Sequence, residues 1–173
     1  MKRVSQLTAL ALLMGLAAST TCAAETMPAL TLSHLQQQHG VAIDTRLSAY
    51  YNGWPQRANG PEGHEPQALN LSARWLGAMS DDQLRAWAKQ HQLQSDTPIA
   101  LYGSPEDNVS VAARLKQTGF TRLSTLSDAL SQTDRLQKLP HFEQLVYPQW
   151  LHDLQQGTGK CLKPPGERRS SIC

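Results

Sequence analysis

The sequence predicts an α/β fold: a doubly wound parallel sheet of four to five strands with helices on both faces. Helix and strand patterns alternate along the chain, and the connections between them are short. The segment "PIALY", residues 98–102, is apolar throughout, which is typical of a strand covered on both faces. A helix pattern follows it at residues 105–118, and units of this kind form parallel sheets with right-handed crossovers.

The first elements are short. Leu32 and Leu35 predict a helix that ends at Gly40, and "VAID" predicts a strand near residues 41–45. The loop "NGWPQRANGPEGHEPQ" is rich in turn residues and is expected to be polar and exposed. A second strand is expected after it, near residues 68–71.

The second half of the body carries clearer helix signals. Ser80 caps "DDQLRAWAKQHQL", whose acidic first turn favours the helix dipole. The apolar residues of this helix lie on or near one face: Leu84, Trp87, Ala88 and Leu93. The third strand is "PIALY", and the helix after it ends before Gly119. "TRLSTL", residues 121–126, completes the set as a fourth strand.

Residues 1–24 have the layout of a secretory signal peptide. Lys2 and Arg3 precede an apolar run at residues 7–18, and the small residues of "STTCAAE" suit cleavage near Ala24. A lipoprotein anchored through Cys22 is the alternative, but "STTC" lacks the expected aliphatic residue. No later segment approaches about 20 consecutive apolar residues, so no membrane contact is expected after signal removal.

Charge and histidine spacing exclude two other classes. After the signal peptide, the chain holds 14 basic and 14 acidic residues, without a basic stripe interleaved with aromatic residues. Nucleic acid is therefore not an expected partner. The six histidines are scattered and show no metal-ligand spacing, so we expect neither a metal site nor another cofactor.

The two cysteines that remain after cleavage both lie near the end of the chain, at Cys161 and Cys173. A disulfide between them would tie this tail to itself and leave the domain unclamped. The body must therefore be held together by its hydrophobic core, for which about 130 residues suffice.

Several segments resemble a rhodanese domain. "AIDTRLSAYYNGWP" resembles its opening strand and Asp-x-Arg signature, and "GHEPQALNLSARWL" resembles its Gly-His-x-Pro-x-Ala-x-Asn segment. "IALYG" followed by "AARLKQTGF" is similar to its active-site strand and helix. The order and spacing predict a rhodanese-like domain at residues 25–135.

The segment after that domain extends the resemblance. "LPHFEQLVYPQWLHDLQQG" resembles the stretch after the first domain of a bacterial exported thiosulfate sulfurtransferase with three rhodanese-like domains. The resemblance implies a periplasmic protein whose partners are the other rhodanese-like domains of a longer protein.

The resemblance also implies which loop would carry the chemistry. A rhodanese loop has the form Cys-x-x-Gly-x-Arg directly after the strand, and in this chain the pattern falls on Gly103, Ser104, Pro105, Glu106, Asp107 and Asn108. All three defining residues are missing, because Gly103, Glu106 and Asn108 stand in their places. Sulfur transfer needs a thiolate that attacks the sulfane sulfur and holds it as a persulfide. We therefore expect no catalytic residue in this loop.

The residues that are present suit a helix start. Ser104 is a capping residue, Pro105 fits the first helical position, and Glu106 and Asp107 face the positive end of the dipole. The same two acids would disfavour thiosulfate, which is a dianion. Restoring the Cys, Gly and Arg of the pattern, with neutral residues at 105 and 107, is expected to permit at least one sulfur transfer.

Other candidate residues have simpler structural roles. Asp44 and Arg46 are expected to organise the sheet end and the loop, and His64 is expected to serve a turn or packing role. Ser104 does not lie in a Gly-x-Ser-x-Gly motif, so a nucleophilic role is not expected. The four tryptophans are expected to be core or interface residues: Trp54, Trp75, Trp87 and Trp150.

Residues 136–157 are expected to form a helical segment of the kind that packs between domains. Their apolar residues have helical spacing, and Pro148 would start a second helix or kink the first. Without other domains, the segment must fold back or expose an apolar patch. We therefore expect self-association through residues 139–154.

The last segment, residues 158–173, is irregular, with a Pro pair, an Arg pair and no apolar periodicity. Either it is an ordinary disordered tail, or the reading frame changes near Gly157 and the tail is out of frame; we favour the second reading. Two functions remain open. The chain is a non-catalytic rhodanese-like domain of a thiosulfate sulfurtransferase, or it is an active enzyme that uses a tail cysteine or a partner's cysteine.

Overall fold

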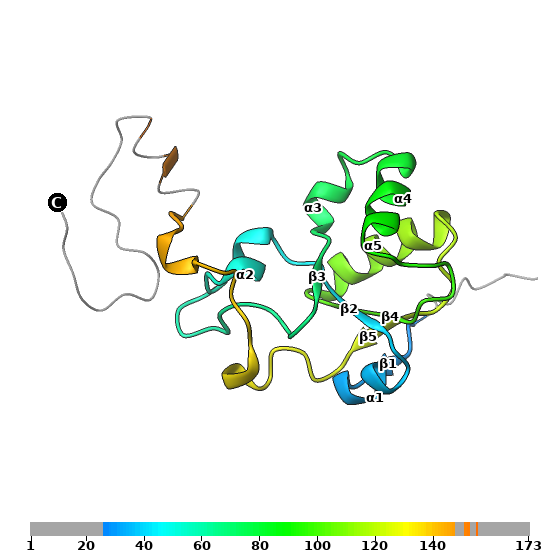
Figure 1. The fold of residues 1–173 in the computed structure, drawn as a ribbon, viewed down its shortest axis with the longest axis horizontal. Coiled ribbons are helices and arrows are strands. Elements are labelled where there is room, and N and C mark those ends of the chain that lie inside the picture. Colours follow the sequence, from blue (N-terminus) through cyan, green and yellow to red (C-terminus); the bar gives the residue numbers. More distant parts are fainter. Residues whose placement is uncertain (1–25, 148–150, 153–154, 156–173) are drawn as a thin grey trace, which may run out of the picture.

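A five-stranded parallel sheet forms the centre of the molecule, in the order β1-β5-β4-β2-β3 (Figure 1). The computed structural model describes residues 26–147, 151, 152 and 155. The strands are β1 (Ala29–Leu30), β2 (Val41–Asp44), β3 (Leu69–Asn70), β4 (Ile99–Tyr102) and β5 (Leu123–Leu126). All four predicted strands are present, and β1 is an additional edge strand.

The strand register places the candidate loop. Asp44 pairs with Tyr102 at the carboxyl ends of β2 and β4, so Asp44 and Gly103 lie at the same edge of the sheet. This placement follows from the parallel arrangement of the two strands. It brings the Asp-x-Arg segment next to the loop between β4 and the following helix.

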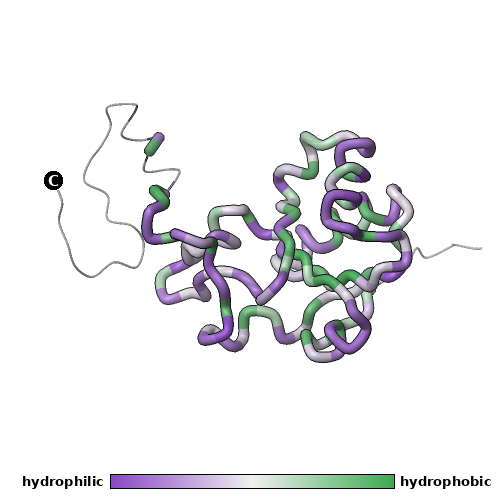
Figure 2. The backbone as a smooth tube through the Cα atoms, viewed as in Figure 1, coloured by the Kyte–Doolittle hydropathy of each residue, from purple (hydrophilic) through white to green (hydrophobic). Residues whose placement is uncertain are grey.

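Helices cover both faces of the sheet, as predicted. Helices α3 (Ala73–Leu76), α4 (Asp81–Gln90) and α5 (Pro105–Gln117) lie on one side, and α1 (Leu32–Gln37) lies on the other (Figure 1). Each side has its own apolar core. Ile43, Leu84 and Leu115 belong to the larger cluster, and Leu35 and Ala100 to the smaller one. Figure 2 shows the hydrophobic residues concentrated along the central strands.

The capping residues account for where the longer helices begin. The Ser80 side chain accepts from the backbone N–H of Gln83, whose own side chain accepts from the N–H of Ser80, a complete capping box. On α4, the face with Leu84 and Ala88 is buried, while Arg85 and Asp82 are exposed. Both features follow from the sequence pattern.

Two short helices were not predicted. Helix α2 (Ser48–Asn52) follows the Asp-x-Arg segment, and α3 follows β3. Neither contains a side-chain cap or enough residues for a periodic apolar pattern.

The prediction of an exposed, polar loop at residues 52–67 is wrong for six of its sixteen residues. Residues 53–55 and 63–65 are buried, and the Glu65 side chain is fully inaccessible. Arg46 donates to the carbonyl of Gly63, and Gln137 forms a two-way backbone bridge with His64. These distant partners cover a segment whose composition is typical of an exposed turn.

Residues 136–147 are less helical than expected. They contain one short 3-10 turn, η2 (Phe142–Gln144), which follows a similar turn, η1 (Thr133–Arg135). Pro140 cannot donate a backbone hydrogen bond, which opposes a continuous helix here. Leu151, His152 and Gln155 are helical, whereas Trp150 and the tail at residues 158–173 lie outside the described residues.

The same segment both folds back and exposes apolar side chains. The Phe142 and Tyr147 rings contact Trp54 edge-on, at centroid distances of 4.8 and 5.6 Å. Leu145 and Val146 remain 42% and 46% exposed. Across the described part of the chain, no helix is long and apolar enough to cross a membrane.

Candidate functional site

The loop after β4 is a tight turn into α5. Gly103 has a φ of +152°, a backbone conformation that favours glycine. Ser104 then caps α5, because its Oγ accepts from the N–H of Asp107 at 3.1 Å. Pro105 occupies the first turn of the helix, followed by Glu106 and Asp107. The predicted helix start is therefore present, and the Ser104 hydroxyl is already engaged.

Thr45 joins this loop to the end of β2. Its Oγ1 lies 3.0 Å from the carbonyl oxygen of Tyr102 and 2.9 Å from Oδ1 of Asn108. Thr45 is 1% exposed, so both contacts are shielded from water. Asn108, at the arginine position of the rhodanese pattern, thus points back into the protein. No local sequence pattern predicted this role of Thr45.

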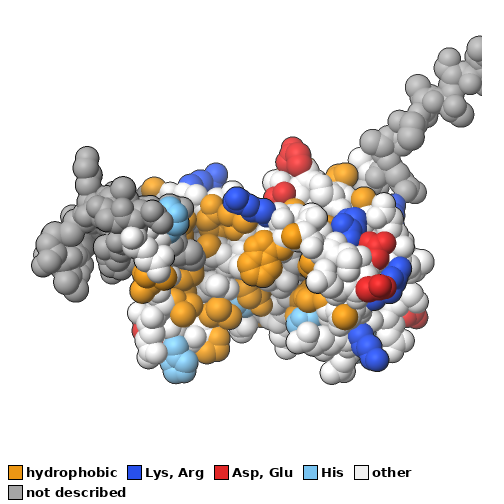
Figure 3. All heavy atoms as spheres, turned by 90° about the horizontal axis from the view of Figure 1, so that it is seen from above, with side chains coloured by type: hydrophobic (Ala, Val, Ile, Leu, Met, Phe, Trp, Pro, Cys, Tyr) orange, Lys and Arg blue, Asp and Glu red, His pale blue; other side chains and the backbone are white. Residues whose placement is uncertain are grey.

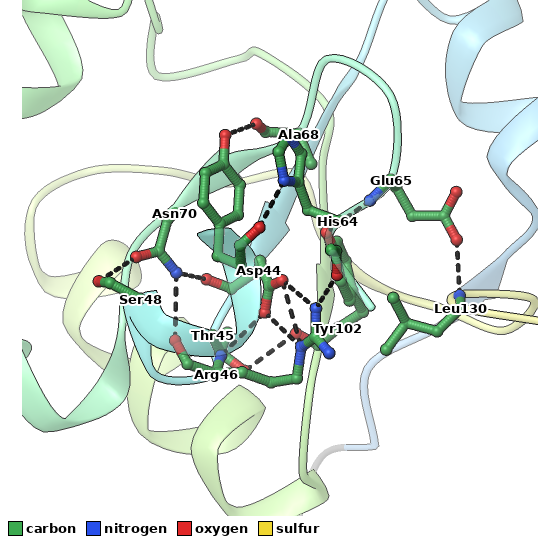
Figure 4. Close-up of polar contacts among 12 residues, drawn as sticks. Asp44, Thr45, Arg46, Ser48, His64, Glu65, Ala68, Asn70, Tyr102 and Leu130 are labelled. Atoms are coloured by element: carbon green, nitrogen blue, oxygen red, sulfur yellow. Dashed lines mark hydrogen bonds and ion pairs between the residues drawn. The ribbon is translucent and has the colours of Figure 1, made fainter. Parts of the chain in front are cut away.

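Asp44 and Arg46 bind each other at the sheet edge (Figure 4). A guanidinium nitrogen of Arg46 lies 2.6 Å from Asp44 Oδ2, and both side chains are buried. Asp44 Oδ1 also accepts from the Arg46 backbone N–H at 3.0 Å, and Arg46 donates to the Gly63 carbonyl at 2.7 Å. These contacts confirm the predicted structural role, because both charges are occupied by protein groups.

Asn70, at the end of β3, lies beside the Asp-x-Arg segment and binds its backbone. Its Nδ2 donates to the carbonyls of Asp44 and Arg46 at 3.0 and 3.1 Å. Ser48, in the first turn of α2, donates to Asn70 Oδ1 at 2.5 Å. The Asp-x-Arg segment is therefore held in one conformation from both sides (Figure 4).

Tyr102 and Glu65 connect the carboxyl edge of the sheet to residues 130–135. The Tyr102 hydroxyl accepts from the Glu65 backbone N–H at 3.1 Å, and burial raises the pKa of Tyr102 so that it stays neutral. The Glu65 carboxylate accepts from the Leu130 N–H at 2.6 Å and forms an ion pair with Arg135. No local sequence pattern predicted these roles of Glu65 and Arg135.

His64 has the packing role that was predicted. Its ring stacks on Tyr51 with centroids 3.8 Å apart, and its Nδ1 lies 2.6 Å from the Tyr51 carbonyl oxygen. Since a carbonyl can only accept, Nδ1 carries the proton of the neutral ring. Burial lowers the pKa of His64, which favours this neutral form.

A cavity of about 290 Å³ lies beside the loop. It is lined by Thr45, Arg46, Leu47, Tyr50, Gln56, Ser72, Arg74, Ser104 and Asp107. Arg46 is already paired with Asp44, and Asp107 adds a negative charge at the helix start. The lining residues include no thiol and no histidine.

The tryptophans divide into different environments. Trp54 is buried and Trp87 packs partly against the core, as predicted. Trp75, in α3, is 62% exposed and is therefore not a core residue. Figure 3 shows hydrophobic side chains gathered on the face that carries α2 and α3. Among residues 26–147, 151, 152 and 155, no three His, Cys, Asp or Glu side chains are grouped to hold a metal ion.

No protein-family model matches the chain. Thiosulfate sulfurtransferase YnjE of Escherichia coli (strain K12) is 64% identical over 167 residues, which are 96% of this chain and 38% of YnjE. The chain thus spans less than two fifths of the length of this curated relative. The crystal structure of YnjE matches with a TM-score of 0.71 at 63% identity, over 86% of this chain and 36% of that chain.

More distant structures share the fold. The wild-type structure of EanB matches with a TM-score of 0.61 at 26% identity, over 76% of this chain and 32% of that chain. The anaerobic ergothioneine biosynthesis enzyme from Chlorobium limicola, in complex with trimethyl histidine, matches with the same TM-score at 27% identity and with the same coverage. The rhodanese-like α/β fold expected from the sequence is therefore confirmed, and the chain is homologous to part of a thiosulfate sulfurtransferase.

Proposed function

We propose that this chain is a non-catalytic rhodanese-like domain that supports the thiosulfate sulfurtransferase activity of other rhodanese-like domains. The observation that carries the proposal is the residue at the start of the loop. Gly103 stands where a rhodanese places its nucleophilic cysteine, and glycine cannot attack a sulfane sulfur. The other defining positions hold Glu106 and Asn108.

The electrostatics of the loop support the same proposal. Asp107 lines the cavity, and Glu106 follows Pro105 in the first turn of α5. Both acids lie at the helix N-terminus, where an active rhodanese loop would stabilise the negative charge of a persulfide. Arg46, the nearest buried cation, is neutralised by Asp44. The two acids therefore weaken the attraction for a dianionic substrate that Arg74, which also lines the cavity, provides.

The proposed partners are further rhodanese-like domains, and the proposed location is the periplasm. Exposed apolar side chains support a partner-binding role, because single domains rarely expose large groups of them. Trp75, Leu145 and Val146 are all more than 40% exposed, and tryptophan is a frequent anchor of protein interfaces. The signal-peptide pattern of residues 1–24 supports export.

A chimera tests this function. The part of E. coli YnjE that matches residues 25–147 is replaced by these residues of this chain, and thiosulfate sulfurtransferase activity is compared with that of YnjE. We expect the chimera to keep most of the activity, because the domain supplies packing and not chemistry. A YnjE variant that lacks the matching part is expected to lose activity or stability.

The alternative function is an active enzyme that uses a tail cysteine or a partner's cysteine. It predicts that the isolated chain, or a mixture with a thiol-bearing partner, turns over thiosulfate through that cysteine. A chimera that loses activity although it folds would contradict the supporting role. Replacing Cys161 and Cys173 separately distinguishes the two functions in the isolated chain.

A further inference from the structure

We propose that Thr45 closes the loop sterically, by occupying the space that any side chain at position 103 would need. Chemistry at position 103 is then prevented by the Thr45 side chain as well as by the absence of the cysteine, glycine and arginine of the rhodanese pattern. The comparison with the rhodanese loop rests on the proposed function, but the contact between positions 45 and 103 does not. The two ideas can therefore fail separately.

The geometry at Gly103 carries the proposal. A Cβ built on Gly103 would overlap with Thr45 Oγ1, and it would lie only 3.4 Å from the Thr45 Cβ. The Cγ of Arg46 lies 3.5 Å away on the same side. Real Cβ atoms do not approach an oxygen this closely, so Thr45 or the loop would have to move.

Thr45 cannot move freely, because its hydroxyl is held by the last carbonyl of β4 and by a side chain of α5. The hydroxyl has one proton, while Tyr102 O and Asn108 Oδ1 both lie within 3.0 Å of Oγ1. Both contacts are satisfied by a three-centre bond, or by an Asn108 amide turned so that Nδ2 donates to Oγ1. Turning Thr45 away would leave buried polar groups without partners.

Asn108 helps to hold Thr45 in the position that blocks residue 103. It lies in the first turns of α5 and is 7% exposed. An arginine at position 108, as in the rhodanese pattern, would remove one of the two groups that hold the Thr45 hydroxyl. The proposal adds a condition to the loop restoration expected from the sequence: while its hydroxyl is held, Thr45 must also become smaller.

The first test measures whether positions 45 and 103 compete for space. Gly103→Ala adds only the Cβ, and its effect on Tm is measured in three full-length backgrounds: Thr45, Thr45→Ala and Thr45→Val. Alanine removes both the bulk and the hydrogen bonds of Thr45. Valine removes the hydrogen bonds and keeps the bulk, so it is the matched control.

We expect Gly103→Ala to lower Tm much less in the Thr45→Ala background than in the other two. Some loss will remain, because the φ of Gly103 disfavours every other residue. An equal loss of Tm in the alanine and valine backgrounds would overturn the proposal, since bulk at position 45 would then have no influence.

The second test uses a thiol as the probe. Gly103→Cys is combined with Glu106→Gly in the same three backgrounds, with Asn108 kept and with the natural cysteines at positions 22, 161 and 173 changed to serine. Alkylation by iodoacetamide is followed in folded protein. We expect Cys alkylation to be about tenfold faster with alanine at position 45, because the thiol then has room to reach solvent.

The two tests together are decisive. Equal alkylation rates in the three folded backgrounds would contradict the proposal. If the Cys variants do not fold, the Tm comparison with Gly103→Ala still decides it. Neither result depends on the chimera with YnjE, which tests the supporting function separately.

Discussion

Glu65 Oε2 lies 2.8 Å from Nε of Arg135, which is 70 residues further along the chain. The Glu65 side chain is completely buried, and the Arg135 side chain is 23% exposed. Hydrogen bonding to Glu65 raises the pKa of Arg135, as expected for a cation held by a carboxylate. This pair joins the buried part of the 52–67 loop to the segment that follows β5.

The pair predicts a large effect of Arg135→Ala on stability. Removing the cation leaves the Glu65 carboxylate buried with only the Leu130 N–H as a partner. We expect a loss of about 2–3 kcal/mol in the free energy of unfolding, below the range for fully buried pairs because Arg135 is partly exposed. Urea denaturation followed by circular dichroism measures it.

Arg85→Ala is the matched control for this prediction. Arg85 also forms an ion pair with a carboxylate, Asp82, at 2.7 Å, but both side chains are largely exposed. Its loss is expected to change the free energy of unfolding by at most about 0.5 kcal/mol. Similar effects of the two substitutions would show that the Glu65–Arg135 pair has no special structural role.

His64 predicts a pH dependence of stability. Its pKa in the folded protein is lowered below the ordinary value of 6.5 by burial, so the unfolded chain binds a proton more readily. The contribution of His64 to stability is therefore complete above pH 6.5 and is lost as the pH falls toward the folded pKa. Asp44 and Glu65 oppose this shift, and Arg46 reinforces it.

The measurement compares the wild type with His64→Asn at several pH values. The difference between their free energies of unfolding should shrink as the pH falls below 6.5, because only the wild type gains a proton on unfolding at this position. A difference that is constant between neutral and mildly acidic pH would show that burial of His64 does not control its titration.

The exposed residues of the 139–147 segment predict self-association. Leu145→Ser together with Val146→Ser should reduce the concentration-dependent association of the chain, because it removes two exposed apolar side chains. Sedimentation velocity over a range of concentrations measures the effect. Val109→Ser is the control, since Val109 is 62% exposed but lies on α5. A wild-type chain that stays monomeric at high concentration would disprove this prediction.

The sequence was sufficient for the elements that have local signals. Apolar runs marked β2 and β4, and the Ser80 and Ser104 caps marked the starts of α4 and α5. The loop at residues 103–108 could be placed because it follows a buried strand directly. In each case, the residues that define the element are close together in the chain.

The long-range contacts around the candidate site could not be predicted from local sequence signals. Burial of the 52–67 loop depends on Gln137 and Arg135, which lie more than 60 residues away in sequence. A single glutamate in a turn-rich stretch is usually exposed, so the composition of the loop wrongly predicted an exposed Glu65. Thr45 was visible between Asp44 and Arg46, but its contact with Asn108 depends on how β2 and β4 pair.

The most direct measurement of the central proposal is thiosulfate:cyanide turnover by the purified chain, with E. coli YnjE as the active reference. The wild type is compared with Cys161→Ser and with Cys173→Ser, so that each cysteine of the tail is tested separately. If the domain is non-catalytic, thiocyanate formation stays at the level of a protein-free control in all three. Robust turnover by the wild type that disappears in one of the two variants would contradict this account.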